Sequence, residues 1–259
     1  MAARRERKGA KITRSTQEYP AVATTDSHLL DTKDLCGHKL AALDGDIGHV
    51  RDFYFDDNIW VIRYAIADTG SWLTGRQVLL SPHAFGKLDQ SEKTLPINLR
   101  RMQIQDSPPI ESYKPVSRQY EVEYFRYYGW PAYWAGDGMW GMGGFPVLVP
   151  PAKDEIEAQR IYYHRDDKHL QSTEEVTGYP IQAVDGVIGH VGSFLVDDRS
   201  WAIRQMVVKA GHWYSGKEIR IPISQIERIS FREAKVIVTL TKAEIEKTAD
   251  HELAQAGTG

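Results

Sequence analysis

The heptapeptide Asp-Gly-Asp-Ile-Gly-His-Val at residues 44–50 returns as Asp-Gly-Val-Ile-Gly-His-Val at residues 185–191. Residue 185 is thus the counterpart of residue 44, and this offset of 141 residues continues on both sides of the motif without a gap. The matched positions are Gly37/Gly178, Phe53/Phe194, Asp56-Asp57/Asp197-Asp198, Trp60/Trp201, Ile62/Ile203, Arg63/Arg204, Gly70/Gly211, Trp72/Trp213 and Gly75/Gly216. The chain is therefore an internal duplication, and each copy should form the same supersecondary unit.

Each heptapeptide predicts a β-hairpin, because Asp-Gly supplies the positive φ that a tight turn needs. The turn joins an expected strand at residues 38–43 to a longer one at residues 47–55. The longer strand has apolar side chains at both parities, which predicts a β-bulge or a strongly coiled barrel strand. Asp31 and Ser172 each stand three residues before an acid, so a single capped helical turn should open each copy.

The next strand is expected to bury a tryptophan face. Trp60, Ile62 and Tyr64 share one parity, while Arg63 and its counterpart Arg204 point the other way. An outward arginine pairs with a carboxylate of its own domain, which cross-strand pairing favours, or with a carboxylate of a partner. Arg63 and Arg204 are therefore candidate interaction residues.

Further strands are expected at residues 78–80 and 95–99, with counterparts at residues 219–221 and 236–240. A short helix should then close each copy. Five or six short strands per copy, separated by regular turn signals, predict a mainly β fold of two tandem small antiparallel β-barrels with short helices.

The duplication divides the chain into five segments. Residues 1–27 are expected to be a disordered basic tail and residues 249–259 a flexible C-terminus. The two barrel-like domains are predicted at residues 28–107 and 169–248, joined by a linker at residues 108–168.

The linker contains a predicted helix at residues 117–128, in which Tyr120, Tyr124 and Tyr127 share a face and which Gly129 can end. An aromatic and glycine-rich loop follows. Its large aromatic side chains are Trp130, Tyr133, Trp134, Trp140 and Phe145. So much aromatic surface is not left in water. We therefore expect residues 130–145 to be ordered, in the groove between the barrels or on a second copy of the chain, and to be the main candidate interaction surface.

The composition is that of an ordinary soluble protein, and a net charge of -3 gives no general attraction to nucleic acid. The most apolar run, residues 139–149, is too short and too broken by glycine and proline to cross a bilayer. No apolar signal core follows the basic start, which predicts a cytoplasmic protein. Cys36 is the only cysteine and its counterpart is Thr177, so neither a disulfide nor a paired-cysteine metal site is expected.

No motif predicts catalysis. His49 and His190 occupy equivalent places and suggest a two-histidine site, but a surface role is favoured. The Asp44 turn and the Asp-Asp pairs fit turn duty better than calcium binding. The glycine-rich stretches lack the strand-to-helix context of a phosphate loop. We therefore expect no enzyme, no cofactor and no metal.

These motifs, together with Trp-x-Ile-Arg and Thr-Gly-Ser-Trp-Leu-Thr-Gly-Arg-Gln-Val-Leu-Leu-Ser-Pro at residues 69–82, resemble the PRC-barrel family. That barrel is found in the cytoplasmic domain of the purple-bacterial photosynthetic reaction-centre H subunit and in a ribosomal RNA maturation factor. The resemblance covers about residues 28–107 and 169–248. It implies a non-catalytic bacterial barrel that docks on a partner assembly.

The first functional hypothesis is a non-enzymatic adaptor or assembly protein that docks on a protein complex. The second is an RNA- or ribosome-associated maturation factor, which requires a basic face that the balanced charge does not indicate. The third is a soluble relative of the H subunit on a membrane complex of the photosynthetic light reaction, favoured by the basic tail and the broken apolar run. The sequence names no protein partner and leaves homo-oligomers and peripheral membrane attachment open, while nucleic acid is not expected.

Overall fold

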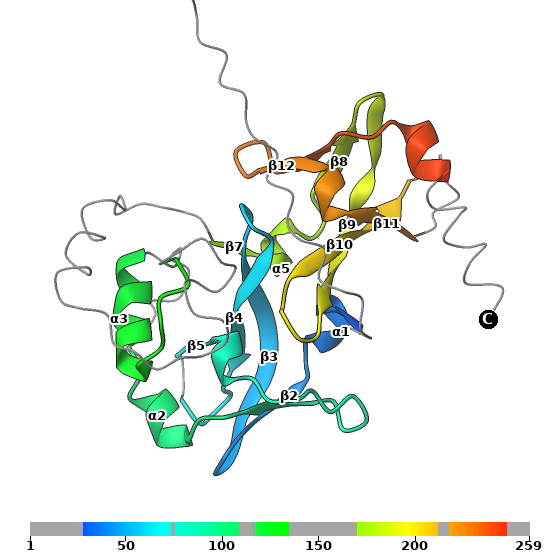
Figure 1. Ribbon diagram of the computed structural model, residues 1–259. Coiled ribbons are helices and arrows are strands. Elements are labelled where there is room, and N and C mark those ends of the chain that lie inside the picture. The colour runs from blue at the N-terminus through cyan, green and yellow to red at the C-terminus, as the bar shows by residue number, and fades with distance from the viewer. Residues whose placement is uncertain are drawn as a thin grey trace, which may run out of the picture.

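The computed structural model describes residues 28–73, 76–108, 116, 118–134, 170–211 and 218–247 (Figure 1). These residues form a mainly β structure with short helices, as predicted, arranged in two sheets. The prediction of wholly antiparallel pairing is wrong, because one pair of strands in each sheet, at residues 39–42 with 94–97 and 180–183 with 235–238, is parallel. The first sheet has the strand order β5-β4-β3-β2-β6 and the second β11-β10-β9-β8-β13-β12. Neither order returns to its first strand within the described residues, so closure into two barrels stays a prediction.

The elements of the first copy are β1 (Leu29–Asp31), α1 (Thr32–Leu35), β2 (Lys39–Ala42), β3 (Gly45–Asp56), β4 (Val61–Asp68), β5 (Val78–Leu80), the 3-10 turn η1 (Pro82–Ala84), β6 (Thr94–Ile97) and α2 (Arg101–Gln105). The helix α3 (Arg118–Tyr128) follows. Those of the second copy are β7 (Leu170–Ser172), α5 (Thr173–Val176), β8 (Pro180–Ala183), β9 (Gly186–Asp197), β10 (Ile203–Ala210), β11 (Glu218–Pro222), the 3-10 turn η3 (Ile223–Gln225), β12 (Ile226–Ser230) and β13 (Lys235–Val238), and residues 242–247 are helical.

The two copies share local details and the order of five strands, but the second sheet has the additional strand β12 beside β13. Asp31 and Ser172 cap the opening turns α1 and α5 through their side chains, as the sequence predicted. The predicted irregularity is also found, since the pairing of β3 with β4 and of β9 with β10 shifts register twice. One shift in each pair skips Arg63 or Arg204, so each arginine lies at a bulge of its strand.

The copies exchange their first strands. β1 pairs antiparallel with β9 of the second copy, and β7 pairs antiparallel with β3 of the first. The helical turns follow their strands, so that α1 packs against β9 and α5 against β3 (Figure 1). The repeat boundaries read from the sequence therefore divide the chain by similarity, whereas each sheet contains a strand from the other repeat.

A pair of backbone hydrogen bonds joins the copies at their centre. Trp60 and Trp201 both have a φ of 57°, which is rare for a side chain of this size. The Trp60 carbonyl accepts from the Ile203 N–H at 2.7 Å, and the Trp201 carbonyl accepts from the Ile62 N–H at 2.9 Å. The left-handed backbone thus makes the same contact twice, once from each copy.

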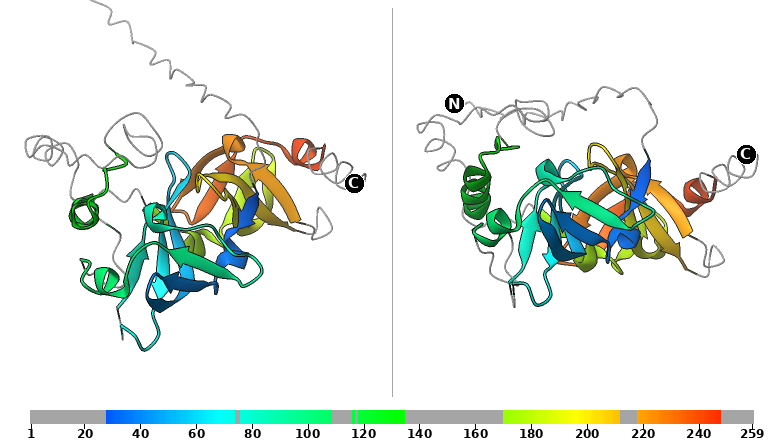
Figure 2. Two further views of the ribbon diagram at one scale, coloured as in Figure 1. Left: turned by 60° about the horizontal axis from the view of Figure 1, so that its bottom comes forward. Right: turned by 90° about the horizontal axis from the view of Figure 1, so that it is seen from below.

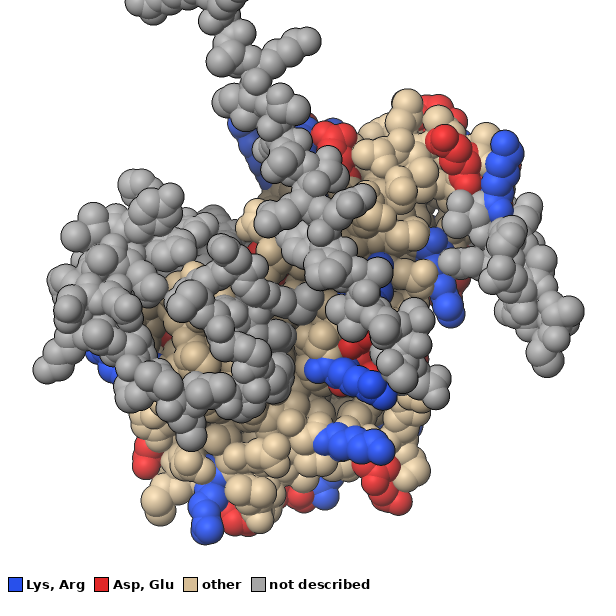
Figure 3. Space-filling model, viewed as in Figure 1, with Lys and Arg blue, Asp and Glu red and all other residues tan. Residues whose placement is uncertain are grey.

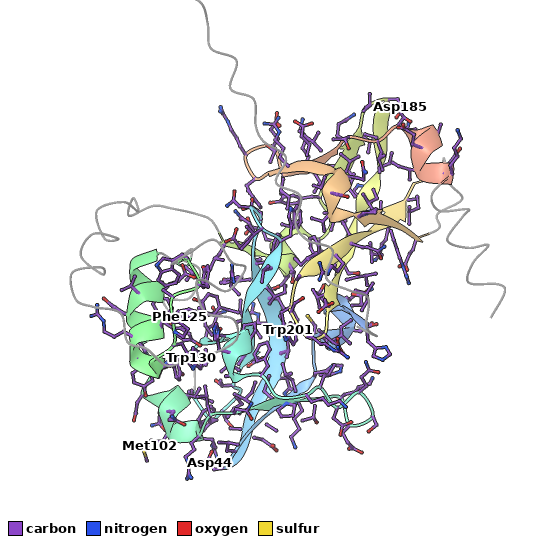
Figure 4. The ribbon with its side chains drawn as sticks, in the orientation of Figure 1. Asp44, Met102, Phe125, Trp130, Asp185 and Trp201 are labelled. Atoms are coloured by element: carbon purple, nitrogen blue, oxygen red, sulfur yellow. The ribbon has the colours of Figure 1, made fainter. Side chains whose placement is uncertain are left out.

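One apolar core spans this junction. The rings of Phe55 and Phe194, which belong to different copies, lie 5.3 Å apart. Trp201 packs 6.1 Å from Phe53 of the first copy and is only 5% exposed. Figure 4 shows Trp201 in the middle of the molecule, beside the long strand of the first sheet. Burial of these rings across the junction favours the two sheets staying together.

A steric constraint explains why the fifth position of each heptapeptide, Gly48 or Gly189, is occupied by glycine. Gly48 has a φ of 118°, and a Cβ atom built there would lie 1.9 Å from the Asp68 carbonyl oxygen on β4. Gly189 repeats this, with 2.2 Å to the Lys209 carbonyl oxygen on β10. Only glycine allows this close crossing of neighbouring strands.

We predict that Gly48→Ala lowers the free energy of unfolding by roughly 3 kcal/mol or more, because strain and overlap with backbone add together. Gly70→Ala is the matched control, since Gly70 also has a positive φ but open space around its Cβ position. It should cost only about 1 kcal/mol. Urea unfolding followed by circular dichroism measures both. Equal losses in the two variants would contradict the steric explanation.

Candidate functional site

The helix α3 covers the outer side of the first sheet, away from the second copy (Figure 1), and two further views place it there as well (Figure 2). Glu121, Tyr124 and Phe125 are its buried side chains, whereas Tyr127 is 42% exposed. The predicted helix is therefore present, but its buried face is rotated toward Glu121 and Phe125. Tyr127 instead lies at the rim, where its hydroxyl donates to the Gln103 carbonyl at 2.9 Å.

Gly129 ends α3, as predicted. It has a φ of 69° and its N–H donates to the Arg126 carbonyl, while the Trp130 N–H donates to the Phe125 carbonyl at 3.0 Å. This is the hydrogen-bond pattern of a Schellman motif, in which the residue after the glycine turns back onto the helix. It brings the Trp130 ring to 6.1 Å from Phe125.

Residues 130–134 then pack into an aromatic cluster on α3. Trp130 stacks on Tyr128 at 4.5 Å and on His83 of η1 at 5.5 Å. Phe125 meets the edges of neighbouring rings, with centroids 5.6 Å from Tyr133 and 5.3 Å from Trp134. Figure 4 shows Phe125 and Trp130 between α3 and the sheet. Residues 130–134 thus lie on the outer side of the first sheet, and the expected seat between the copies is wrong for them, while contact with a second copy of the chain stays a prediction.

Trp140 and Phe145, the other two aromatic candidates, lie outside the described residues. The prediction that Tyr133 is an interaction residue is wrong, because Tyr133 is only 4% exposed and cannot present its ring to a partner in this structure. Trp130 and Trp134 are half-buried and keep part of their surface accessible. The aromatic side chains of residues 130–134 therefore bury much of their apolar surface against α3.

A polar centre lies beneath these rings. The Glu121 carboxylate is fully buried and accepts hydrogen bonds from the Tyr64 hydroxyl at 2.9 Å and from the Tyr133 hydroxyl at 2.5 Å. The Arg63 guanidinium carbon lies 3.6 Å from the centre of the Tyr133 ring, a cation–π contact. This centre connects β4, α3 and the loop after it.

Charge balance explains how the centre tolerates burial. Burial lowers the pKa of Arg63, and the nearby Tyr133, Asp56 and Glu121 act in the opposite sense. Burial also raises the pKa of Tyr64 well above its usual value, with the Glu121 charge as the next cause. Burial and the Glu121 charge both keep the Tyr64 hydroxyl protonated, so that it donates to the Glu121 carboxylate. A buried carboxylate held by donors and a nearby cation is a structural anchor.

Arg63 lies on the outer side of the first sheet, but it is not the exposed interaction residue that the sequence predicted. Tyr64, expected on the core face with Ile62, also faces α3. Arg63 is 1% exposed, because it lies at a bulge of β4 and α3 covers this side of the sheet. Its counterpart Arg204 is exposed, and its guanidinium lies 3.7 Å from the Asp197 carboxylate of the same copy. Arg204 thus makes the own-domain pair that cross-strand pairing favours.

His83 and Glu121 were missed by the sequence reasoning. His83 follows Ser81-Pro82, and its Nδ1 lies 3.0 Å from the Ser81 hydroxyl oxygen. Burial, with the charge of Arg63 as a second cause, lowers its pKa to about 4. Glu121 could have been noticed as an acid three residues before Tyr124 on the same helix face.

The other acidic and histidine candidates have local roles. Asp44 accepts from the Arg101 N–H at 2.8 Å and Asp185 from the Lys242 N–H at 3.0 Å, so each hairpin turn is tied to the helix that closes its copy. His49 and His190 are exposed. Among the residues that the structure describes, no three His, Cys, Asp or Glu side chains gather as a metal site. Burial raises the pKa of the Cys36 thiol to about 11, which disfavours the reactive thiolate.

Both hairpin ends expose apolar side chains. Leu43 is 66% exposed and lies by the turn of the first copy, near the start of the helix that carries Met102, which is 71% exposed. The counterpart of Leu43 is Val184, 68% exposed, and Val187 is 51% exposed. Figure 4 shows Asp44 and Met102 at one end of the molecule and Asp185 at the other. We name these two places the hairpin tips.

Over the coloured part of the face in Figure 3, Lys and Arg are interspersed with Asp and Glu. No helix in the described part of the chain has the length and apolarity to cross a membrane. A scan of protein-family models gave no match to the chain, and a search of curated proteins gave none either.

We predict that Glu121→Ala lowers the free energy of unfolding by about 3–5 kcal/mol, because it removes the acceptor of two buried hydroxyls and the counter-charge of a buried guanidinium. Glu123→Ala on the exposed side of α3 is the matched control and should change stability by about 0.5 kcal/mol or less. Thermal unfolding of both variants tests the anchor. A loss in Glu121→Ala no larger than in the control would show that this centre does not hold α3 in place.

We also predict a stability loss in mild acid that depends on His83. Its pKa falls from an ordinary 6.5 to about 4 on folding, so the unfolded chain binds a proton that the folded chain refuses. The contribution of His83 to the free energy of unfolding is therefore fully present above pH 6.5, and the free energy of unfolding falls by on the order of 2 kcal/mol toward pH 4. Urea unfolding across this range should show a shallower pH dependence for His83→Gln than for the wild type or the exposed-site control His190→Gln. Parallel curves for all three would contradict the assignment.

Proposed function

We propose that this protein is a non-enzymatic cytoplasmic adaptor, built of two PRC-barrel-like domains, that docks on a protein complex. The observation that carries the proposal is the pair of equivalent hairpin tips with exposed apolar side chains at opposite ends of one body. The shared order of five strands in the two sheets supports the tandem-barrel interpretation. The family resemblance supplies the expectation that such barrels dock rather than catalyse.

The tips suit a docking role for a physical reason. Single exposed apolar residues are common on protein surfaces and need no explanation. Leu43 and Val184, however, are counterparts, and both stand beside a turn whose aspartate is fixed by a backbone N–H. A fixed turn presents its apolar side chain with little loss of conformational entropy on binding, as an interface anchor requires.

Strand exchange supports simultaneous use of both tips. Because β1 and β7 each complete the sheet of the other copy, the two ends cannot separate without breaking backbone pairing. Two docking points at a fixed separation gain affinity from each other when a partner assembly matches their spacing.

The buried polar groups of the first copy are better explained by a structural role than by a catalytic one. Glu121, Tyr64 and Tyr133 satisfy one another beneath the aromatic cluster, so their polar atoms serve to hold α3 on the sheet. These buried contacts fix α3 on the first sheet, which is consistent with an adaptor in which α3 belongs to the rigid body of the first copy.

We predict that Val184→Asp, Leu43→Asp and their combination weaken capture of protein partners from native lysate, with the double variant weakest, because a charge replaces each apolar anchor. Gln90→Asp adds the same charge at another exposed turn and should leave capture unchanged. Thermal unfolding should be unchanged in all variants. The measurement is the amount of each partner protein that co-purifies with the tagged wild-type or variant protein, determined by mass spectrometry.

Capture that is identical in the double variant and the wild type would contradict docking through the tips. Strong salt-sensitive binding to ribosomal RNA would favour the maturation-factor alternative instead. Membrane pelleting that depends on residues 1–27 would favour the alternative of a membrane-complex relative.

A further inference from the structure

The exchanged segments form two arms and two seats. Arm 1 is β1 with α1, residues 29–35, and arm 2 is β7 with α5, residues 170–176. Seat 1 is the part of β3 around Asp52, which receives arm 2. Seat 2 is the part of β9 around Ser193, which receives arm 1.

Arm 2 reaches seat 1 through hydrogen bonds to one carboxylate. Asp52 is 4% exposed and accepts from the Ser172 hydroxyl at 2.5 Å, the Thr173 hydroxyl at 2.7 Å and the Glu174 N–H at 2.9 Å. Hydrogen bonds to a buried charged acceptor are stronger than those between neutral groups. Seat 1 is therefore built for an arm that brings donors.

Arm 1 reaches seat 2 with the roles reversed. Ser193, also 4% exposed, donates its hydroxyl to the Asp31 carboxylate at 2.8 Å. The Thr32 hydroxyl oxygen accepts from the Phe194 N–H at 3.1 Å. Seat 2 is therefore built for an arm that brings a carboxylate.

The positions involved are counterparts in the repeat. Residue 31 corresponds to residue 172 and residue 52 to residue 193, both by the offset of 141. Each contact thus joins one aspartate to one serine, but the aspartate belongs to the seat in one contact and to the arm in the other. If arm 1 lay on a first-repeat seat, the half-buried Asp31 would face the buried Asp52, and the two carboxylates would repel each other.

We propose that these two aspartate–serine pairs are a recognition code that favours the exchanged arrangement. Each seat then joins one aspartate to one serine, whereas arms placed on their own repeats would set Asp31 against Asp52 and leave Ser172 against Ser193 without a carboxylate. The arm is supplied by the same chain or by a second copy of it. This inference concerns how the two repeats recognise each other and is independent of the docking function proposed above.

The test is a rescue experiment in the full-length chain. Ser193→Asp places two carboxylates together at seat 2 and should lower the melting temperature by about 5–10 °C at pH 7.5. Asp31→Ser with Ser193→Asp recreates at seat 2 the pair found at seat 1, and should restore most of that loss. Ser193→Asn is the uncharged control of equal size and should cost less than Ser193→Asp. The loss in Ser193→Asp should also shrink toward pH 4.5, where one carboxylate takes up a proton.

The code is wrong if Asp31→Ser with Ser193→Asp is no more stable than Ser193→Asp alone, or if Ser193→Asn costs as much as Ser193→Asp. Should Ser193→Asp fail to fold, the yield of folded double variant against that of Ser193→Asn gives the same comparison. Light scattering then identifies the source of the arm. A monomeric mass with rescue assigns the arm to the same chain, and a dimeric mass with rescue assigns it to a second copy.

Discussion

The exchange of first strands between the copies is the constraint on which the rest of the structure depends. A long strand such as β3 or β9 would otherwise leave a row of N–H and C=O groups at its edge, a position open to wrong pairing. β7 and β1 occupy those edges, and each belongs to the other repeat. The Trp60 and Trp201 carbonyls add a second crossing at the centre, at the expense of left-handed backbone in both. The two sheets consequently form one body with one core.

Within this shared frame the copies have diverged on their outer sides. In the first sheet Tyr64 faces α3 through its hydrogen bond to Glu121, and the Tyr124 hydroxyl of α3 donates to the Leu79 backbone carbonyl at 2.9 Å. The counterparts of Tyr64 and Leu79 in the second sheet are Gln205, which is half-buried, and Arg220, which is exposed. The same divergence separates Arg63, buried under Tyr133, from the exposed Arg204. One repeat therefore carries a cover that the other, among the described residues, does not.

The sequence was informative where a feature is local. Capping by Asp31 and Ser172, the hairpin turns, the bulges and the end of α3 at Gly129 follow from residue types at short spacing. The exchange was not predictable in this way, because two copies with the same apolar pattern offer β1 equivalent edges on β3 and β9. Tyr64 was placed on the wrong face because the bulge at Arg63 changes the parity of β4. Arg63 was expected to be exposed because α3 and Tyr133, which cover it, have no counterpart in the repeat pattern. The buried site around Glu121 was missed for the same reason.

Duplication also allows the two ends of the molecule to differ in sequence. In a dimer of identical chains, any change at one hairpin tip appears at the other by symmetry. A fused pair is free of this constraint, and the tips already differ: Met102 accompanies Leu43, whereas Val187 accompanies Val184. Strand exchange holds the ends in one body while the fused repeats vary independently. In the proposed adaptor role, this construction would hold two unlike surfaces of one assembly at a set separation, which neither a flexible linker nor a symmetric dimer provides.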